Sequence, residues 1–170
     1  LERKQFLNRF VKYYDDGQVT MPGNYLSKMT KIQAMIGLMQ TAKYDTIIAS
    51  HQQCANYYQQ QLQAIAELTL PPYNPGATYS HYAVRVADRK SLIDYCLKRG
   101  VQLGTIIDYN IPAIKFYQAY AGEFKYDVAT LWASTVVNLP VWDIKASQQT
   151  VQLLKQYYLD MQCEHKITEG

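Results

Sequence analysis

Short groups of polar side chains in this sequence have residue types that suit ligand binding. In the first group, Asn24 and Lys28 lie close together and could hold an anionic group, since Lys acts as a point charge and Asn as a hydrogen-bond donor. In the second group, Tyr79, His81 and Arg85 are separated by two and four residues, the even spacing that places side chains on one face of a strand. A solvated turn and a solvent-facing strand are the plainer interpretations.

The third group, Asp108, Tyr109 and Asn110, comes directly before Ile111-Pro112. This is a loop position, and binding sites are often built on loops. Simple turn residues would give the same pattern, so both interpretations stay open.

The cysteines and histidines give no sign of a metal site or a disulfide framework. The sequence has 3 cysteines, Cys54, Cys96 and Cys163. Their odd number, wide spacing and lack of a CxxC pair predict reduced cysteines that pack as small apolar residues. The 3 histidines are equally scattered, so we expect no bound metal.

Composition limits the class of protein. The chain has 170 residues, 48% hydrophobic and 18% charged, which predicts a folded domain with a buried core. The net charge of +3 is spread along the chain, whereas phosphate binding by nucleic-acid partners needs clustered cations. No apolar run reaches membrane-spanning length and no signal peptide opens the chain. We therefore expect a soluble, cytoplasmic protein with no nucleic-acid or membrane partner.

The elements that must position the polar groups follow from hydrophobic periodicity. Helical spacing predicts helices over 1–14, from 29 to about 41, and over 45–66, 89–99, 126–133 and 147–161. Thr30 and Asp88 are the expected N-caps, and Gly100 is expected to end a helix in the left-handed conformation. Strands are predicted over 79–86, 101–107 and 135–139, and the proline-rich segment 70–79 is predicted as a loop.

This order of elements predicts an α+β fold, with long helices and a small, mainly antiparallel sheet covered by helices on one face. We expect a leading helix and turn over residues 1–27, the folded domain over 28–161, and a tail over 162–170. The phosphate-binding patterns GxGxxG and GxxxxGK are both absent from the sequence.

Several segments, taken in order, resemble DegT/StrS-type pyridoxal-phosphate-dependent sugar aminotransferases. "MTKIQAMIG" is similar to the family's Arg-x-Ser-x-x-Gln-Ala-Ala-Ile-Gly helix, and "AVRVADRKSLIDYCLKRGV" to its strand, Asp-Arg, helix and Arg-Gly segment. "YNIPAIKFYQAY" resembles the family's Tyr-x-x-Pro loop, and "VVNLPVW" its Leu-Pro turn. The resemblance extends from Leu1 to about Leu159.

The resemblance implies the small C-terminal domain of a fold-type I pyridoxal-phosphate enzyme. In that family the Schiff-base lysine, the aspartate at the pyridine nitrogen and the ring-stacking aromatic belong to a large domain, which would precede Leu1. We therefore expect no catalytic residue in this chain and no transamination by it alone. The complete enzyme would use pyridoxal phosphate, would take its amino group from glutamate, would act on a nucleotide-linked keto-sugar and would form a homodimer.

The resemblance also implies roles for the polar groups. Asn24 and Lys28 would contact the cofactor phosphate across a dimer interface. The second and third groups would bind the substrate.

The sequence departs from the family pattern at positions that lie near the substrate in relatives. These departures are Leu26 at an asparagine, Lys28 at an arginine, Ser80 and Asp108 at histidines, and Trp142 where histidine or methionine is common. An alternative hypothesis is therefore a stand-alone, non-catalytic relative used for binding or dimerisation. A third is an unrelated α+β binding module.

Overall fold

The computed structural model describes residues 27–105, 110–120, 122–123 and 125–168, without the side chains of 164–168. The predicted helix over 1–14 and the candidate residues Asn24, Asp108 and Tyr109 lie outside the described residues. The elements are α2 (Lys31–Thr41), α3 (Tyr44–Leu62), β1 (Tyr82–Arg85), α4 (Arg89–Lys98), η1 (Ile111–Ala113), η2 (Lys115–Tyr120), α5 (Asp127–Thr135), β2 (Val136–Leu139) and α6 (Ile144–Thr168).

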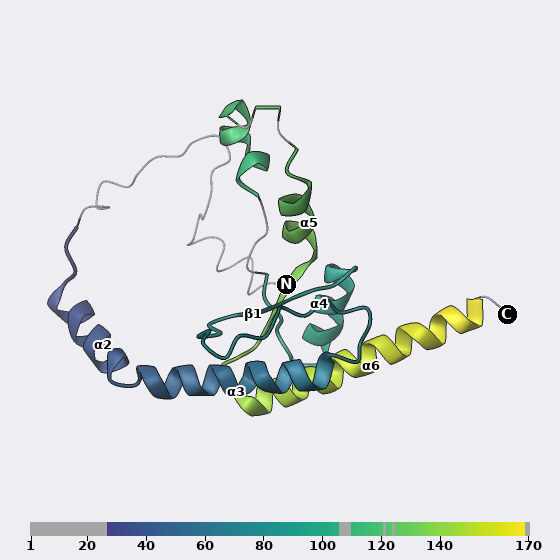
Figure 1. Ribbon diagram of the computed structural model, residues 1–170, viewed down its shortest axis with the longest axis horizontal. Helices are drawn as coiled ribbons and strands as arrows, with labels where there is room; N and C mark the ends of the chain where they lie inside the picture. Colours follow the sequence, from purple (N-terminus) through teal and green to yellow (C-terminus); the bar gives the residue numbers. More distant parts are fainter. Residues whose placement is uncertain (1–26, 106–109, 121, 124, 169–170) are drawn as a thin grey trace.

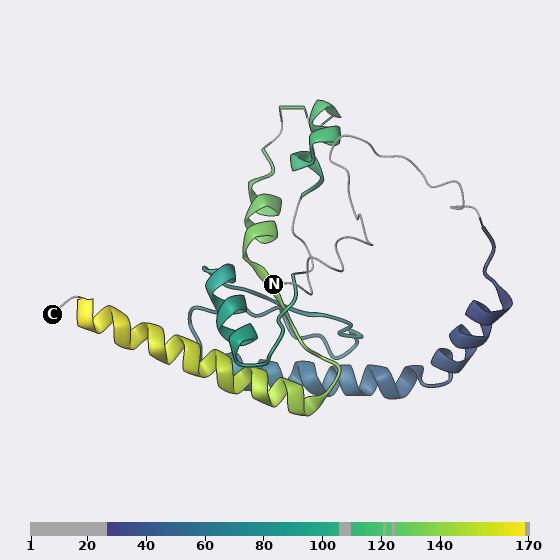
Figure 2. The same ribbon diagram turned by 180° about the vertical axis from the view of Figure 1, so that it is seen from behind.

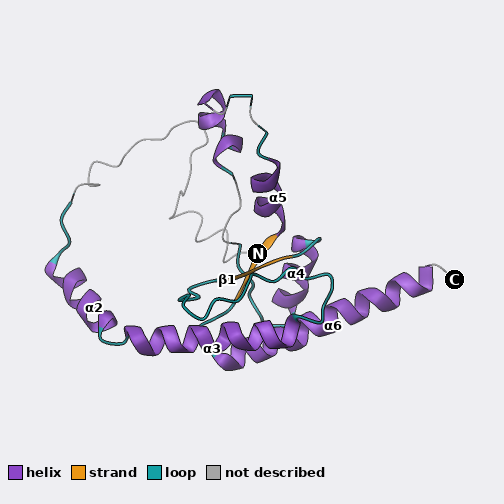
Figure 3. Cartoon of the chain, viewed as in Figure 1, coloured by secondary structure: helices purple, strands orange, loops and turns teal. Residues whose placement is uncertain are grey.

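The arrangement has a small body and projecting parts. In Figures 1 and 2, α3 and α6 run side by side below the short sheet, and α4 packs beside them. α2 and the end of α6 extend from opposite ends of this body, while η1, η2 and α5 form an arm that stands away from it. Figure 3 shows how short the strands are beside the helices.

α2 begins at a capping box, as predicted from Thr30. The Thr30 hydroxyl accepts a hydrogen bond from the backbone N–H of Gln33 at 3.3 Å, and the Gln33 side chain accepts one from the backbone N–H of Thr30 at 2.9 Å. α2 ends at Thr41 and α3 starts at Tyr44, so the predicted interruption is confirmed. α3 ends at Leu62, earlier than the predicted residue 66.

Both ends of α4 follow the sequence prediction. Asp88 accepts hydrogen bonds from the Ser91 backbone N–H at 2.9 Å and from the Ser91 hydroxyl at 2.7 Å, and these bonds lower the pKa of the Asp88 carboxyl. Gly100 has a φ of +85°, the left-handed conformation expected after a helix. The N–H of Val101 donates to the carbonyl of Cys96 at 3.0 Å and completes the helix end.

The sheet is small and antiparallel, as predicted. β1 pairs with β2, with Arg85 opposite Val136. Single bridges extend the ladder on both sides, from Thr69 to Arg85 and from Gly104 to Asn138. The spatial order is therefore Thr69, β1, β2 and Gly104.

Two strand predictions are too long. β1 starts at Tyr82 and not at residue 79, because Tyr79 has a φ of +48° and cannot continue an extended strand. In the predicted strand over 101–107, Gly104 is the only described residue that pairs with the sheet, since the amide of Val101 is used to end α4. The last helix is longer than predicted, from Ile144 to Thr168.

The core lies between one face of the sheet and the helices α3, α4 and α6. Its sheet side is formed by alternate strand residues, and its helix side by fully buried apolar residues from each helix. The main members are Tyr82, Val84, Val137, Leu139, Tyr58, Leu62, Leu92 and Leu154. The prediction that helices cover one face of a small sheet is therefore confirmed.

Candidate functional site

The first polar group is only partly described. Lys28 is exposed and lies just before α2, while Asn24 falls outside the described residues. Whether the two side chains converge therefore stays a prediction.

Tyr79 has an unusual backbone conformation and is held by its loop. Its positive φ is rare for a bulky residue, and the surrounding contacts must compensate for it. The Tyr79 hydroxyl accepts a hydrogen bond from the Asn74 backbone N–H at 2.6 Å, and the ring stacks on Tyr73 with centroids 5.8 Å apart. The ring also lies 6.2 Å from Tyr82, on the core side. The sequence predicted that Tyr79 shares the outer strand face with Arg85. In the structure it does not, so this prediction is wrong for Tyr79.

The loop that contains Tyr79 is fixed from α3. The Gln52 side-chain amide donates to the carbonyl of Pro75 at 3.2 Å and to that of Ala77 at 3.1 Å. Asn74 also closes a local turn by accepting from the Gly76 N–H at 2.9 Å. The strand therefore begins at a well-defined place, and His81 follows the loop as an exposed side chain with Nδ1 3.2 Å from the Ser80 hydroxyl.

Arg85 is the last residue of β1 and lies between Thr69 and Val136, and its side chain is on the face away from the core. Its N–H and C=O both pair with Thr69 at 3.0 Å. The guanidinium carbon lies 5.5 Å from the centroid of the Trp132 ring on α5, a cation–π contact. Arg85 Nε is buried and has no hydrogen-bond partner among the described residues, so this donor could serve a ligand.

Asn138 on β2 contributes a second buried polar atom to the same face. Its Oδ1 accepts no hydrogen bond within the described part of the chain. Its backbone is fully paired with Gly104, by N–H to O at 2.7 Å and by the reverse bond at 3.0 Å. Sequence reasoning does not include Asn138 among the site residues, although a lone amide in the apolar run "VVNLPV" is a usable signal.

Asn110 stands at the start of the arm, and both ends of its carboxamide are hydrogen-bonded there. Its Oδ1 accepts from the Ala113 N–H at 2.9 Å and caps η1, and its Nδ2 donates to the Thr130 hydroxyl at 2.7 Å. These contacts engage Oδ1 and one of the two N–H groups of Nδ2.

A separate groove of about 430 Å³ lies between the end of α3 and α6. Two side-chain hydrogen bonds cross this region, from Lys155 to Gln61 at 3.0 Å and from Gln162 to Glu67 at 3.2 Å. Its lining contains none of the residues predicted to bind cofactor or substrate. It is therefore not part of the candidate site.

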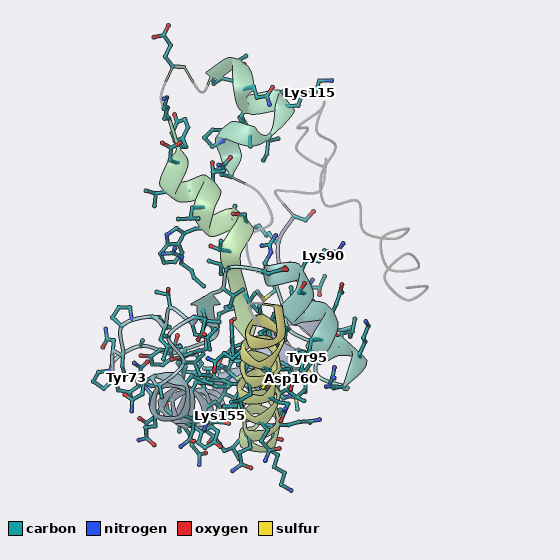
Figure 4. The ribbon with its side chains drawn as sticks, turned by 90° about the vertical axis from the view of Figure 1, so that its right-hand side faces the viewer. Tyr73, Lys90, Tyr95, Lys115, Lys155 and Asp160 are labelled. Carbon is teal, nitrogen blue, oxygen red and sulfur yellow. The ribbon has the colours of Figure 1, made fainter. Side chains whose placement is uncertain are left out.

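The described residues do not form a pocket for pyridoxal phosphate by themselves. The cofactor needs a shielded lysine beside its ring and a carboxylate at the ring nitrogen. Every lysine whose side chain the structure describes is exposed, and Figure 4 shows Lys90, Lys115 and Lys155 on separate parts of the molecule. Lys28 has the charge for a contact with the cofactor phosphate. Because none of these lysines is shielded, no step of cofactor chemistry follows from the described residues.

Other site types can be compared with the same residues. Among the described residues, no three His, Cys, Asp or Glu side chains gather as a metal site requires. Cys54 and Cys96 are fully buried free thiols, as the sequence predicted, whereas Cys163 is exposed, so the prediction of a packed apolar residue is wrong there. Burial raises the pKa of Cys96 to about 11. In the described part of the chain, no helix has the length and apolar character needed to cross a membrane.

Comparison with protein families matches residues 5–154 to the DegT/DnrJ/EryC1/StrS aminotransferase family. No curated protein matches the sequence significantly. Aminotransferases of this family depend on pyridoxal phosphate.

Solved structures share the fold at low identity. DesV from S. venezuelae, solved in complex with a ketimine intermediate, has a TM-score of 0.70 and 18% identity over 92% of this chain and 43% of its own. The aminotransferase TlmJ from Streptoalloteichus hindustanus has a TM-score of 0.68 and 20% identity over 95% of this chain and 45% of its own. The structure of NtdA from Bacillus subtilis with bound cofactor PMP gives 0.64 and 20%, over 86% of this chain and 35% of its own. The chain thus spans less than half the length of each of these structures.

Proposed function

The chain belongs to the DegT/DnrJ/EryC1/StrS aminotransferase family, and we propose that it is the small C-terminal domain of an aminotransferase that acts on nucleotide-linked keto-sugars. The complete enzyme takes its amino group from glutamate and uses pyridoxal phosphate. The observation that carries this proposal is the family match, which extends over most of the chain.

We assign the imine-forming lysine to the part of the complete protein outside this sequence. Two observations support this division. The lysines whose side chains the structure describes are all exposed, and the solved relatives are more than twice as long as the stretch they share with this chain. This chain then supplies substrate contacts and a phosphate contact, and does not catalyse the reaction alone.

The surface of α2 supports a further body packed against it. No residue of α2 is buried, yet one side of the helix carries large apolar residues, Ile32, Met35, Ile36, Leu38 and Met39. Such a continuous apolar surface is typical of an interface. We propose that the large domain and the second copy of a homodimer cover it, which would also bring Lys28 and Asn24 to the cofactor phosphate.

For substrate binding we propose the predicted groups in their observed positions. Arg85 belongs to the outer face of β1, His81 comes directly before this strand, and Asn110 stands at the start of the arm. Asp108 and Tyr109 come directly before it in the sequence. Tyr79 contributes through the fixed loop and not from the strand face.

A second candidate function is a non-catalytic relative that keeps this scaffold for binding or dimerisation. The substitutions at Leu26, Asp108 and Trp142 favour it, because these positions lie near the substrate in relatives. The two functions differ in whether the natural protein carries a cofactor-binding lysine.

The first experiment measures the intact mass of the native protein from its own cells. The aminotransferase proposal predicts a product of roughly twice the 19.6 kDa of this chain or more. That purified product should show the absorption band of a lysine imine with pyridoxal phosphate, and glutamate should bleach it. A native product of 19.6 kDa that binds no cofactor would instead favour the non-catalytic relative.

A further inference from the structure

Two buried polar atoms of opposite character lie on the outer face of the sheet. Arg85 Nε is a donor and Asn138 Oδ1 an acceptor, and neither has a hydrogen-bond partner among the described residues. Ala83 is directly opposite Asn138, and Arg85 is opposite Val136, so Arg85 and Asn138 are diagonal neighbours. Diagonal positions are separated by about 7–8 Å between Cα atoms, within reach of a side chain as long as arginine.

The positions on either side of Asn138 in the sheet are occupied by small residues. Its direct neighbour on β1 is Ala83, and its bridge partner on the other side is Gly104. A Cβ built on Gly104 would lie 3.5 Å from the Cβ of Asn138, so a larger side chain there would stand against the amide. Across the sheet, the large polar side chain of Asn138 therefore lies between two small residues, Ala83 and Gly104.

Leaving such groups unpaired is costly, and the combination of donor and acceptor restricts what can pair with both. A hydroxyl group can accept from Arg85 Nε–H and donate to Asn138 Oδ1 at the same time. A carboxylate or phosphate oxygen accepts only, and an ammonium donates only. The pair therefore selects a neutral hydroxyl over the charged groups of glutamate or a diphosphate.

We infer that Arg85 and Asn138 together bind one hydroxyl group of the sugar and determine specificity for it. This rests on the proposed function, in which the substrate is a nucleotide-linked sugar. Asn138 is then a binding residue that the family resemblance did not identify. A sugar that lacks this hydroxyl leaves both buried atoms unpaired and binds more weakly.

Entry of the hydroxyl requires a small shift of the surrounding side chains, because both atoms are screened from solvent. Trp132 is the side chain placed to allow it. It lies against the Arg85 guanidinium at 5.5 Å, yet is itself 45% exposed. An exposed cation–π contact contributes little binding energy, so the indole can move without disrupting the pairing of β1 with β2.

The test is calorimetric binding to the complete protein as produced by its own cells. The probes are UDP-glucose, dTDP-glucose and analogues in which one ring hydroxyl is replaced by hydrogen. We expect one deoxy analogue to bind roughly tenfold more weakly than its parent, as the loss of a hydrogen bond to buried groups predicts. Binding of the sugar nucleotides needs no turnover, so the readout is separate from catalysis.

Variants of Asn138 identify the residue responsible. Asn138→Leu keeps the backbone pairing with Gly104 and should bind the parent and that analogue equally. Asn138→Asp keeps an oxygen at this position that accepts from the hydroxyl, so it should retain the discrimination. Asn56→Leu is the matched control, because Asn56 is exposed on α3 and should leave the discrimination unchanged.

The other outcomes overturn the inference in distinguishable ways. If every analogue binds like its parent, or if Asn138→Leu still discriminates, the two atoms hold a water molecule only, and the proposed function stands without this inference. If the natural protein binds none of these sugar nucleotides, the proposed substrate class fails and the inference fails with it.

Discussion

The guanidinium of Arg89 donates a hydrogen bond from Nη1 to the carbonyl of Ala133 at 2.7 Å and so joins the start of α4 to the end of α5. The carbonyl of Val136 lies 3.5 Å from the same nitrogen. The last carbonyls of a helix lack partners within the helix, and a cation there also interacts with the negative end of the helix dipole. Arg89 therefore fixes the arm that carries Trp132 and Asn110.

Replacing Arg89 by alanine should release this end of the arm. We expect a loss of about 1–2 kcal/mol in the local stability of α5, from the charged hydrogen bond and the dipole interaction. Amide hydrogen exchange over residues 127–135 measures it. Lys98→Ala, at the exposed end of the same α4, is the control. Equal exchange rates in the two variants would contradict the role given to Arg89.

The packing of α6 against the sheet predicts a large contrast between two leucines on this helix. Leu154 is fully buried, whereas Leu159 is 56% exposed. Leu154→Ala should lower the free energy of unfolding by about 2–5 kcal/mol through lost burial and the remaining cavity. Leu159→Ala should change it by about 0.5 kcal/mol or less. Urea unfolding followed by circular dichroism compares them, and similar midpoints would mean that α6 does not pack as described.

Local signals explain which parts of the fold were predictable from the sequence. Asp88 and Gly100 determine the ends of α4 through contacts within a few residues, and Thr30 does the same for α2. The alternation around Val84 also predicts the buried face of β1. These features can be predicted without knowing any contact between segments that are distant in the sequence.

The missed features depend on contacts between distant segments. The segment that starts at residue 101 was predicted as a strand because it is apolar. However, the N–H of Val101 is hydrogen-bonded to the carbonyl of Cys96, and the pairing of Gly104 depends on the position of β2. The position of Tyr79 depends on its loop, which Gln52 of α3 holds through the carbonyls of Pro75 and Ala77. Asn138 becomes a candidate only when its place beside Arg85 is known, which the sequence does not give.

Tyr79 offers a direct test of the fixed loop. Tyr79→Phe keeps the ring stack on Tyr73 but removes the hydrogen bond with the Asn74 N–H. We expect a loss of about 1 kcal/mol in the free energy of unfolding, with faster amide exchange at residues 74–77. Tyr73→Phe, in the partner ring of the stack, is the control and should leave the exchange of this loop unchanged. If Tyr79→Phe behaves like Tyr73→Phe, the hydrogen bond does not hold the loop.

The buried phenol of Tyr58 predicts how stability changes in alkaline solution. Its hydroxyl donates to the carbonyl of Pro140 at 2.7 Å, and burial raises the pKa of Tyr58 from 10.0 to about 12. Between these values the unfolded chain loses the phenol proton while the folded protein keeps it. The unfolded state then binds fewer protons, so the free energy of unfolding falls as the pH rises.

Tyr58→Phe should therefore reduce the pH dependence of stability while lowering stability itself near neutral pH. The lost hydrogen bond costs about 1 kcal/mol near neutral pH. The decline above pH 10 should become shallower by up to about 1.4 kcal/mol per pH unit, because one titrating group is gone. Burial also raises the pKa of Tyr82 and Tyr158, but both remain in the variant, so the difference between the two curves isolates Tyr58. Urea unfolding from about pH 8 to about pH 11 measures both curves, and parallel declines would show that Tyr58 is not the titrating group.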